Sequence, residues 1–299
     1  MVLPGFFSAE RIAEARHRFD RVRVERAGEL VVDSRATGRR SFWRDAEDPA
    51  VADFKFNDVY LLDATTRELA LDAKLTPILE ACLGEPAVLC NSLHFEKGSG
   101  QPMHIDSLYM TPRSSHGLIA SWIALEEVHP DSGPLWYWRG SHRIPLFRFK
   151  DGSHHVGPGE QGDWDRYMAT ELTERGMEPE TFLAKRGDVF LWHADVVHAG
   201  SPIRDAARTR ASIVCHYYRE SDARALDYAL EPLNGAFWFE RLGQPVRVEV
   251  SNFSPDGGDF PAERYLRRYP DVEQALRRGL LRSAWDHFRE HGAAEGRGI

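Results

Sequence analysis

The stretch Ser121–Arg143, SWIALEEVHPDSGPLWYWRGSHR, decides the fold. It contains most of one short apolar segment, 118–128, and all of a second, 134–138, and residue types that favour turns separate the two. Similar segments bounded by Gly or Pro lie at 87–95, 188–194 and 211–218. A parallel doubly wound sheet would need helices between such strands. The pattern therefore predicts a mainly β fold, an antiparallel sandwich or barrel with flanking helices.

Helices are expected mainly before these strands. Residues 8 to about 30 carry apolar side chains at helical spacing behind a serine N-cap, and residues 65–83 indicate two short helices. Residues 33–57 are polar and irregular, which indicates a loop. The long insertion 141–186 indicates a loop with one short helix near 166–175.

Composition and charge exclude several classes of protein. The 299 residues carry a formal charge of −8, which argues against nonspecific binding to nucleic acid. Hydrophobic content is 42%, and no apolar run of about 18 residues occurs, so we expect a soluble cytoplasmic protein without a membrane span. The three cysteines show no CxxC spacing and indicate reduced thiols rather than disulfides or a zinc site.

The C-terminal part differs from the rest. We expect a main domain over 1–244, a linker over 245–258 and a small helical module over 259–299. The module could pack on the main domain as a helical hairpin or dock a protein partner. These two alternatives stay open at the level of sequence.

A metal site is indicated by two short motifs. In MHIDS, His104 and Asp106 would point to the same face of a strand. GDVFLWHADVVHAGSP offers a third ligand, His193 or His198. Two histidines and one carboxylate leave coordination positions open, the arrangement typical of non-haem Fe(II) oxygenases.

An arginine follows this pair of motifs along the chain. Arg210 precedes the apolar strand ASIVCHYY and could bind a carboxylate in a bidentate pair. A surface arginine that closes a turn is the alternative for this residue taken alone. When Arg210 is considered together with the histidines, the binding of a carboxylate is favoured.

These motifs, together with SWIALEEVHPDSGPLWYWRGSHR and TRASIVCHYY, resemble the phytanoyl-CoA dioxygenase family of Fe(II)- and 2-oxoglutarate-dependent oxygenases. The resemblance covers roughly residues 3–220, in the family's order. It implies a double-stranded β-helix, or jelly roll. It also implies that His104, Asp106 and His198 bind iron, that Arg210 binds the distal carboxylate of 2-oxoglutarate, and that His193 is a neighbour of the site.

The resemblance extends to further residues. It suggests His94 or Asn91 as a hydrogen-bonding partner of the cosubstrate and, more weakly, Ser201. Arg208 is a minor competitor of Arg210. His142, in the Gly-Ser-His run, is expected to be structural. The tail resembles a helical module appended to various bacterial proteins, which implies a bacterial source.

The implied activity uses Fe(II), 2-oxoglutarate and O₂, and releases succinate and CO₂ while an aliphatic C–H bond of a small metabolite or natural-product intermediate is hydroxylated. Retention of Asp106 favours hydroxylation, desaturation or ring closure over halogenation. Residues 37–56 mix basic and aromatic side chains, as a lid over an anionic, partly apolar ligand would, although an exposed loop explains them equally well.

Two other functions remain open. A cupin-like isomerase or hydrolase could use the same three residues as a Lewis-acid site, with no role for Arg210. A jelly-roll binding or scaffold protein without activity could use its tail to dock a partner.

Overall fold

The computed structural model describes residues 1–49, 53–114 and 116–299, and within them the strands form two sheets. The larger sheet has the order β1 (Val2–Leu3), β9 (Val189–His193), β6 (Leu118–Ala124), β11 (Ser212–Arg219), β5 (Ala87–Phe95), β4 (Phe54–Asn57), β2 (Val31–Ser34) and β3 (Arg40–Phe42). The hairpin of β12 (Ala229–Leu233) and β13 (Ala236–Glu240) joins β5 through β13. The smaller sheet contains β10 (His198–Gly200), β7 (Leu135–Tyr137) and β8 (Glu180–Phe182). All pairings except that of β13 with β5 are antiparallel.

A buried apolar cluster fills the space between the two sheets. Trp122 and Phe190 of the larger sheet pack there against Leu135 and Phe182 of the smaller one. The other face of the larger sheet packs on helices, so its central strands are buried on both faces. In β11 this burial alternates: Ile213 and Cys215 belong to the helix-side core, whereas Val214 belongs to the cluster between the sheets.

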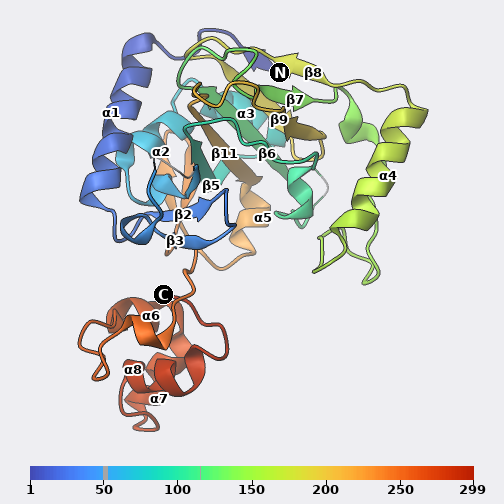
Figure 1. Cartoon of the computed structure of the whole chain (residues 1–299). Coiled ribbons are helices and arrows are strands. Elements are labelled where there is room, and N and C mark those ends of the chain that lie inside the picture. The colour runs from blue at the N-terminus through green and yellow to red at the C-terminus, as the bar shows by residue number, and fades with distance from the viewer. Residues whose placement is uncertain (50–52, 115) are drawn as a thin grey trace.

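The helices cover the flanks of the sheets, as Figure 1 shows. The helix α1 (Ala9–Glu25) begins after Ser8, whose hydroxyl accepts a hydrogen bond from the Arg11 backbone N–H. The remaining helices of this part are α2 (Ala64–Ala70), α3 (Thr76–Leu83), α4 (Gln161–Glu174) and α5 (Glu220–Arg224). The predicted N-terminal helices are confirmed, and α4 extends a few residues further towards the N-terminus than expected. None of the helices in the described ranges is both long and apolar enough to cross a membrane.

The prediction of a loop over residues 33–57 is wrong. The described residues, 33–49 and 53–57, include β3, β4 and the end of β2, which extend the larger sheet. In β4, Phe54 and Phe56 are buried while Lys55 between them pairs with Asp33 of β2 at 2.9 Å. These strands are only three or four residues long and carry charges on one face, so they lack the long apolar run of the central strands. Residues 50–52 lie outside the described residues.

The C-terminal residues fold around a core of their own. Helices α6 (Ala262–Arg268), α7 (Pro270–Arg277) and α8 (Ala284–His287) enclose a mostly aromatic cluster that includes Phe260, Tyr265, Trp285 and Phe288. Figure 1 shows this group of helices below the sheets. The helical character predicted for residues 259–299 is therefore confirmed.

Candidate active site

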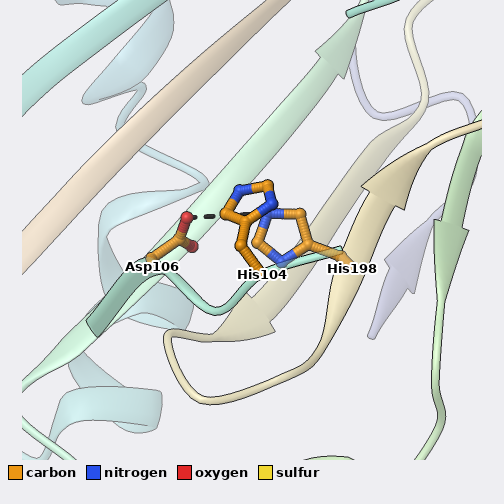
Figure 2. Close-up of side chains that lie close together, drawn as sticks. All are labelled: His104, Asp106 and His198. Atoms are coloured by element: carbon orange, nitrogen blue, oxygen red, sulfur yellow. Dashed lines mark ion pairs between the residues drawn. The ribbon is translucent and has the colours of Figure 1, made fainter. Parts of the chain in front are cut away.

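Three buried side chains from separate parts of the chain converge between the sheets, as Figure 2 shows. His104 and His198 face each other in a short antiparallel bridge with two backbone hydrogen bonds of 3.0 Å, and their ring centroids are 4.2 Å apart. Asp106 Oδ1 lies 3.5 Å from His198 Nε2. One ligand atom from each residue lies within 4.8 Å of the other two. The three side chains could therefore bind a single metal ion.

The backbone around MHIDS differs from the predicted strand. His104 makes only the bridge to His198, and Asp106 already begins a single 3₁₀ turn, Asp106–Leu108. The Asp106 N–H donates to the carbonyl of Ala194 at 2.8 Å. The prediction of a continuous strand is wrong, but the two side chains still reach the same point.

Hydrogen bonds orient each of the three groups. His104 Nδ1 donates to the Pro102 carbonyl at 2.8 Å and His198 Nδ1 to the Val196 carbonyl at 2.9 Å, which leaves both Nε2 atoms as free acceptors. Trp192 Nε1 donates to Asp106 Oδ2 at 2.8 Å. Each residue thus keeps one atom for a metal and uses another to hold its orientation.

The protonation states also suit a metal. Burial, and then the neighbouring His198, lower the pKa of His104 to about 3. Burial alone would raise the pKa of Asp106, but the adjacent His198 and His216 hold it below its usual range. The cluster therefore presents a neutral imidazole and an ionised carboxylate, the forms in which these side chains bind metals.

The sequence analysis missed His216. This residue on β11 places Nε2 3.4 Å from Asp106 Oδ1 and Nδ1 3.1 Å from Asn91 Oδ1. Asn91 Nδ2 in turn donates to Asp58 Oδ1 at 2.9 Å, and Arg241 donates to the other Asp58 oxygen at 2.9 Å. His216 is an even number of residues after Arg210, so strand alternation could have placed both on the same face.

Arg210 is a buried cation without an acidic partner. Its side chain is among the largest that are fully buried, NH1 donates to the Gly133 carbonyl at 3.0 Å, and Nε has no hydrogen-bond partner. Across the described ranges no carboxylate comes within ion-pair distance of it. Burial, reinforced by the nearby Arg35, lowers its pKa to about 10. Because a buried unpaired charge is costly, the site is suited to an anion that enters from outside.

A small cavity of about 50 Å³ connects these groups. Its polar lining includes the three clustered residues together with the arginine and the additional histidine: His104, Asp106, His198, Arg210 and His216. Trp122 also lines it, and its indole N–H has no hydrogen-bond partner. A bound anion at Arg210 would therefore share one cavity with a metal at the cluster.

Other candidates from the sequence lie outside this cavity. His94 is buried on the opposite face of β5, where its ring stacks on Phe19 at 4.7 Å. Ser201 is buried but does not line the cavity. Asn91 reaches the cluster only through its hydrogen bond with His216. Arg208 is largely exposed and pairs with Asp205 at 3.0 Å.

His193 belongs to a different cluster. A turn separates it from His198, and its Nε2 lies 2.8 Å from Nδ1 of His116. Its Nδ1 is 3.5 Å from Asp195, and the ring of His142 lies 5.9 Å away. His193 is therefore not part of the group around Asp106.

A jelly-roll core that encloses a His-x-Asp and a distal His, with an unpaired buried arginine on the same cavity, defines the class of Fe(II)- and 2-oxoglutarate-dependent oxygenases. A sequence model of the phytanoyl-CoA dioxygenase (PhyH) family matches residues 1–211. The chain belongs to this family, whose cofactor is iron and whose cosubstrates are 2-oxoglutarate and O₂.

Known proteins agree with this assignment. The peroxisomal phytanoyl-CoA dioxygenase of Bos taurus is 25% identical over 122 residues, which are 41% of this chain and 34% of the bovine protein. The chain thus matches about a third of the length of that relative. Among solved structures, the non-heme alpha ketoglutarate dependent epimerase SnoN from nogalamycin biosynthesis has a TM-score of 0.53 and 22% identity, over 81% of this chain and 93% of its own. EctD from S. alaskensis, solved with 2-oxoglutarate and 5-hydroxyectoine, has a TM-score of 0.53 and 18% identity, over 74% and 72%. These structures show the shared jelly-roll fold.

Proposed function

We propose that the protein is an Fe(II)- and 2-oxoglutarate-dependent dioxygenase that hydroxylates an aliphatic C–H bond of a small molecule. His104, Asp106 and His198 would hold the iron, and Arg210 would bind the distal carboxylate of 2-oxoglutarate. The observation that carries the proposal is the buried, unpaired guanidinium on the cavity that the three metal-capable residues line.

The residues present fit iron. Two imidazole nitrogens and one carboxylate oxygen are the donor set of this class, and the hydrogen bonds of both Nδ1 atoms already select the tautomer that exposes Nε2. Trp192 fixes Asp106 by holding its second oxygen. The ligands are therefore oriented before the metal binds, which reduces the entropy lost on binding.

Iron with 2-oxoglutarate would supply the activation of O₂ and the oxidation of the substrate C–H bond, with release of succinate and CO₂. Arg210 would orient the cosubstrate by a charge-assisted pair in a site shielded from water. The apolar side chains of Leu135 and Val214 line the same cavity and would limit the access of water.

The reaction type rests on Asp106. Its carboxylate occupies the position that a halogenating enzyme leaves vacant for halide, so an oxidation of carbon without halogen transfer is favoured. A Lewis-acid isomerase or hydrolase is less well supported, because it gives no role to a buried arginine that has no acidic partner in the described structure. A binding protein without activity likewise gives Arg210 no role.

Succinate formation tests the proposal. Protein loaded with Fe(II) under anaerobic conditions should release succinate slowly from 2-oxoglutarate once O₂ is admitted, even without substrate, and removal of iron by a chelator should stop the release. Substrates are then found as compounds that accelerate turnover. Tight iron binding without succinate under any substrate tried would favour the Lewis-acid alternative.

His216 should act as a positioning residue for Asp106. Replacement of His216 by Phe removes the contact with Asp106 Oδ1 and should lower succinate formation about 10- to 100-fold, the usual effect of losing a group that supports a metal ligand. We expect the iron content to remain near that of the wild type at saturating metal, measured by elemental analysis. Full activity in His216→Phe would show that the contact has no role in the reaction.

A further inference from the structure

A second and larger cavity adjoins the candidate active site. Its volume is about 860 Å³, and Phe95, Ser99 and Gln101 line both this cavity and the smaller one beside Asp106. The smaller cavity, at about 50 Å³, leaves little room beyond the iron and its cosubstrate. The larger one, which we term the outer cavity, is therefore where most of a substrate could lie.

The outer cavity is strongly basic. Of the described residues that line it, five are cationic and one is a carboxylate, a net charge of +4 in a protein whose formal net charge is −8: Arg35, Arg39, Arg40, Lys55, Arg247 and Asp33. Asp33 is already shared by Arg40 at 2.6 Å and Lys55 at 2.9 Å. Neither Arg39 nor Arg247 has an ion pair with any residue that the structure describes. The lining thus carries positive charge in excess of what the protein itself neutralises.

Arg35 lines the outer cavity next to Gly100, which lies between Ser99 and Gln101 in the chain. Its side chain is half-buried, donates to the Gly98 carbonyl and has only a distant acidic partner, Asp53 at 4.0 Å. A Cβ atom at Gly100 would lie 2.7 Å from Arg35 NH2, so the absence of a side chain at position 100 makes room for the guanidinium. Its positive charge also contributes to the lowered pKa of Arg210. Positive charge therefore extends from the inner cavity to the outer one.

The linker and the C-terminal module together supply one wall of the outer cavity. Pro245, Arg247, Gly296 and Gly298 line it. Reciprocal backbone hydrogen bonds of 3.1 and 3.0 Å join Val246 to Ile299. Arg247 therefore lies beside residues 296–299, and a Cβ atom at Gly296 would lie 3.0 Å from its NH2.

Contacts with the larger sheet hold this wall in place. Val246 is buried against Val31 of β2 and Phe42 of β3, and Arg264 of α6 lies over the Phe42 ring at 4.8 Å from the centroid. Figure 1 shows the module beside this end of the sheet. The linker therefore places Arg247 in the lining of the same cavity as Arg39 and Arg40.

We propose that the outer cavity binds the substrate of the oxygenase by a multiply charged oxyanion group, phosphoryl or polycarboxylate, and that Arg247 of the linker before the C-terminal module is one of its binding residues. The inference that the bound anion is a substrate rests on the proposed function. The inference that the outer cavity binds an anion does not. The oxyanion would sit among guanidinium groups that form bidentate charge-assisted pairs. The oxidised carbon would point past Phe95 towards Asp106. The linker and the module then contribute to substrate specificity, which neither the packing nor the docking role considered for the module includes.

Binding to the full-length, metal-free protein tests the anion site separately from the oxygenase activity. Pyrophosphate and citrate are the probes, with uncharged glycerol as the negative control, and calorimetry measures affinity at low and high salt. We expect one of the two anions to bind, more weakly at high salt. A preference for pyrophosphate assigns a phosphoryl group and a preference for citrate a polycarboxylate.

Arg247→Gln and Arg39→Gln should each weaken binding of the preferred anion about tenfold or more, the effect of losing one charge-assisted pair. Arg278→Gln is the matched control, because Arg278 is an exposed arginine of the C-terminal module that does not line the cavity. Equal affinity in Arg247→Gln and Arg278→Gln, or no anion binding in the wild type, would overturn the inference. Anion binding through Arg247 without succinate formation would overturn only the oxygenase proposal.

Discussion

Replacement of His198 by alanine should abolish iron binding, whereas His193→Ala should leave it intact. His198 directs Nε2 towards Asp106 and faces His104 across the backbone bridge, so its loss removes one of the three proposed iron ligands. His193 instead contacts His116. We expect the affinity for Fe(II) in His198→Ala to fall by more than the roughly 10- to 100-fold that loss of a supporting residue causes. Anaerobic titration with Fe(II) measures it.

The two substitutions are a matched pair, because each removes an imidazole and the two positions are five residues apart. The His198 backbone hydrogen bonds to His104 do not depend on the side chain, so His198→Ala should keep the fold, which the unfolding temperature of the metal-free protein would show. Loss of iron in His193→Ala with retention in His198→Ala would assign the metal to the cluster of His193, His116 and Asp195.

The central strands could be predicted from the sequence because they are buried on both faces. The predicted segment 87–95 coincides with β5, and 118–128 and 211–218 contain most of β6 and β11. Each is a run of apolar and β-branched residues that ends at a Gly, Pro or charged residue, so its local pattern suffices. The residues of these strands supply much of the core between and beneath the sheets.

The peripheral strands could not be predicted in the same way. β3 and β8 have three residues each, and charged residues occupy one face of β2 and β4. Their formation depends on pairing with strands distant in the chain, such as β4 with β5, and local composition does not contain that information. The same limit explains MHIDS, where the backbone is held by Ala194 and His198 rather than by a strand of its own.

For the same reason, only part of the candidate active site could be predicted from the sequence. The motifs contain the residues that meet at Asp106. The distances between these residues depend on the register between β11 and β5 and on the turn after β9, which the motifs do not give. Alternation decides between neighbours: Leu93 and Phe95 line the cavity, so His94 between them points the other way. The link from Asp106 through His216 and Asn91 requires β11 and β5 to pair with His216 opposite Asn91, which only the structure provides.

Arg210→Met should raise the KM for 2-oxoglutarate by about 30- to 1000-fold, since it removes the proposed charge-assisted bidentate pair, worth about 2–4 kcal/mol in a buried site. Succinate release at varied 2-oxoglutarate concentration measures this change. Arg208→Met is the control: Arg208 is exposed and paired with Asp205, so its KM should stay within about twofold of the wild type. An increase confined to Arg208→Met would place the cosubstrate carboxylate at the other arginine.

The stability of the metal-free protein provides a second test of the role of Arg210, because it distinguishes a ligand-binding arginine from one that supports the fold. Without 2-oxoglutarate, the guanidinium is buried with a single hydrogen bond to the Gly133 carbonyl and an unsatisfied Nε. Exchange of such a group for an apolar side chain of similar length is neutral or stabilising, whereas removal of an arginine that supports the fold is destabilising. We therefore expect the unfolding temperature of metal-free Arg210→Met to equal or exceed that of the wild type. A variant that loses both 2-oxoglutarate affinity and stability would indicate that Arg210 holds the sheets together, and that the loss of affinity follows from unfolding of the cavity.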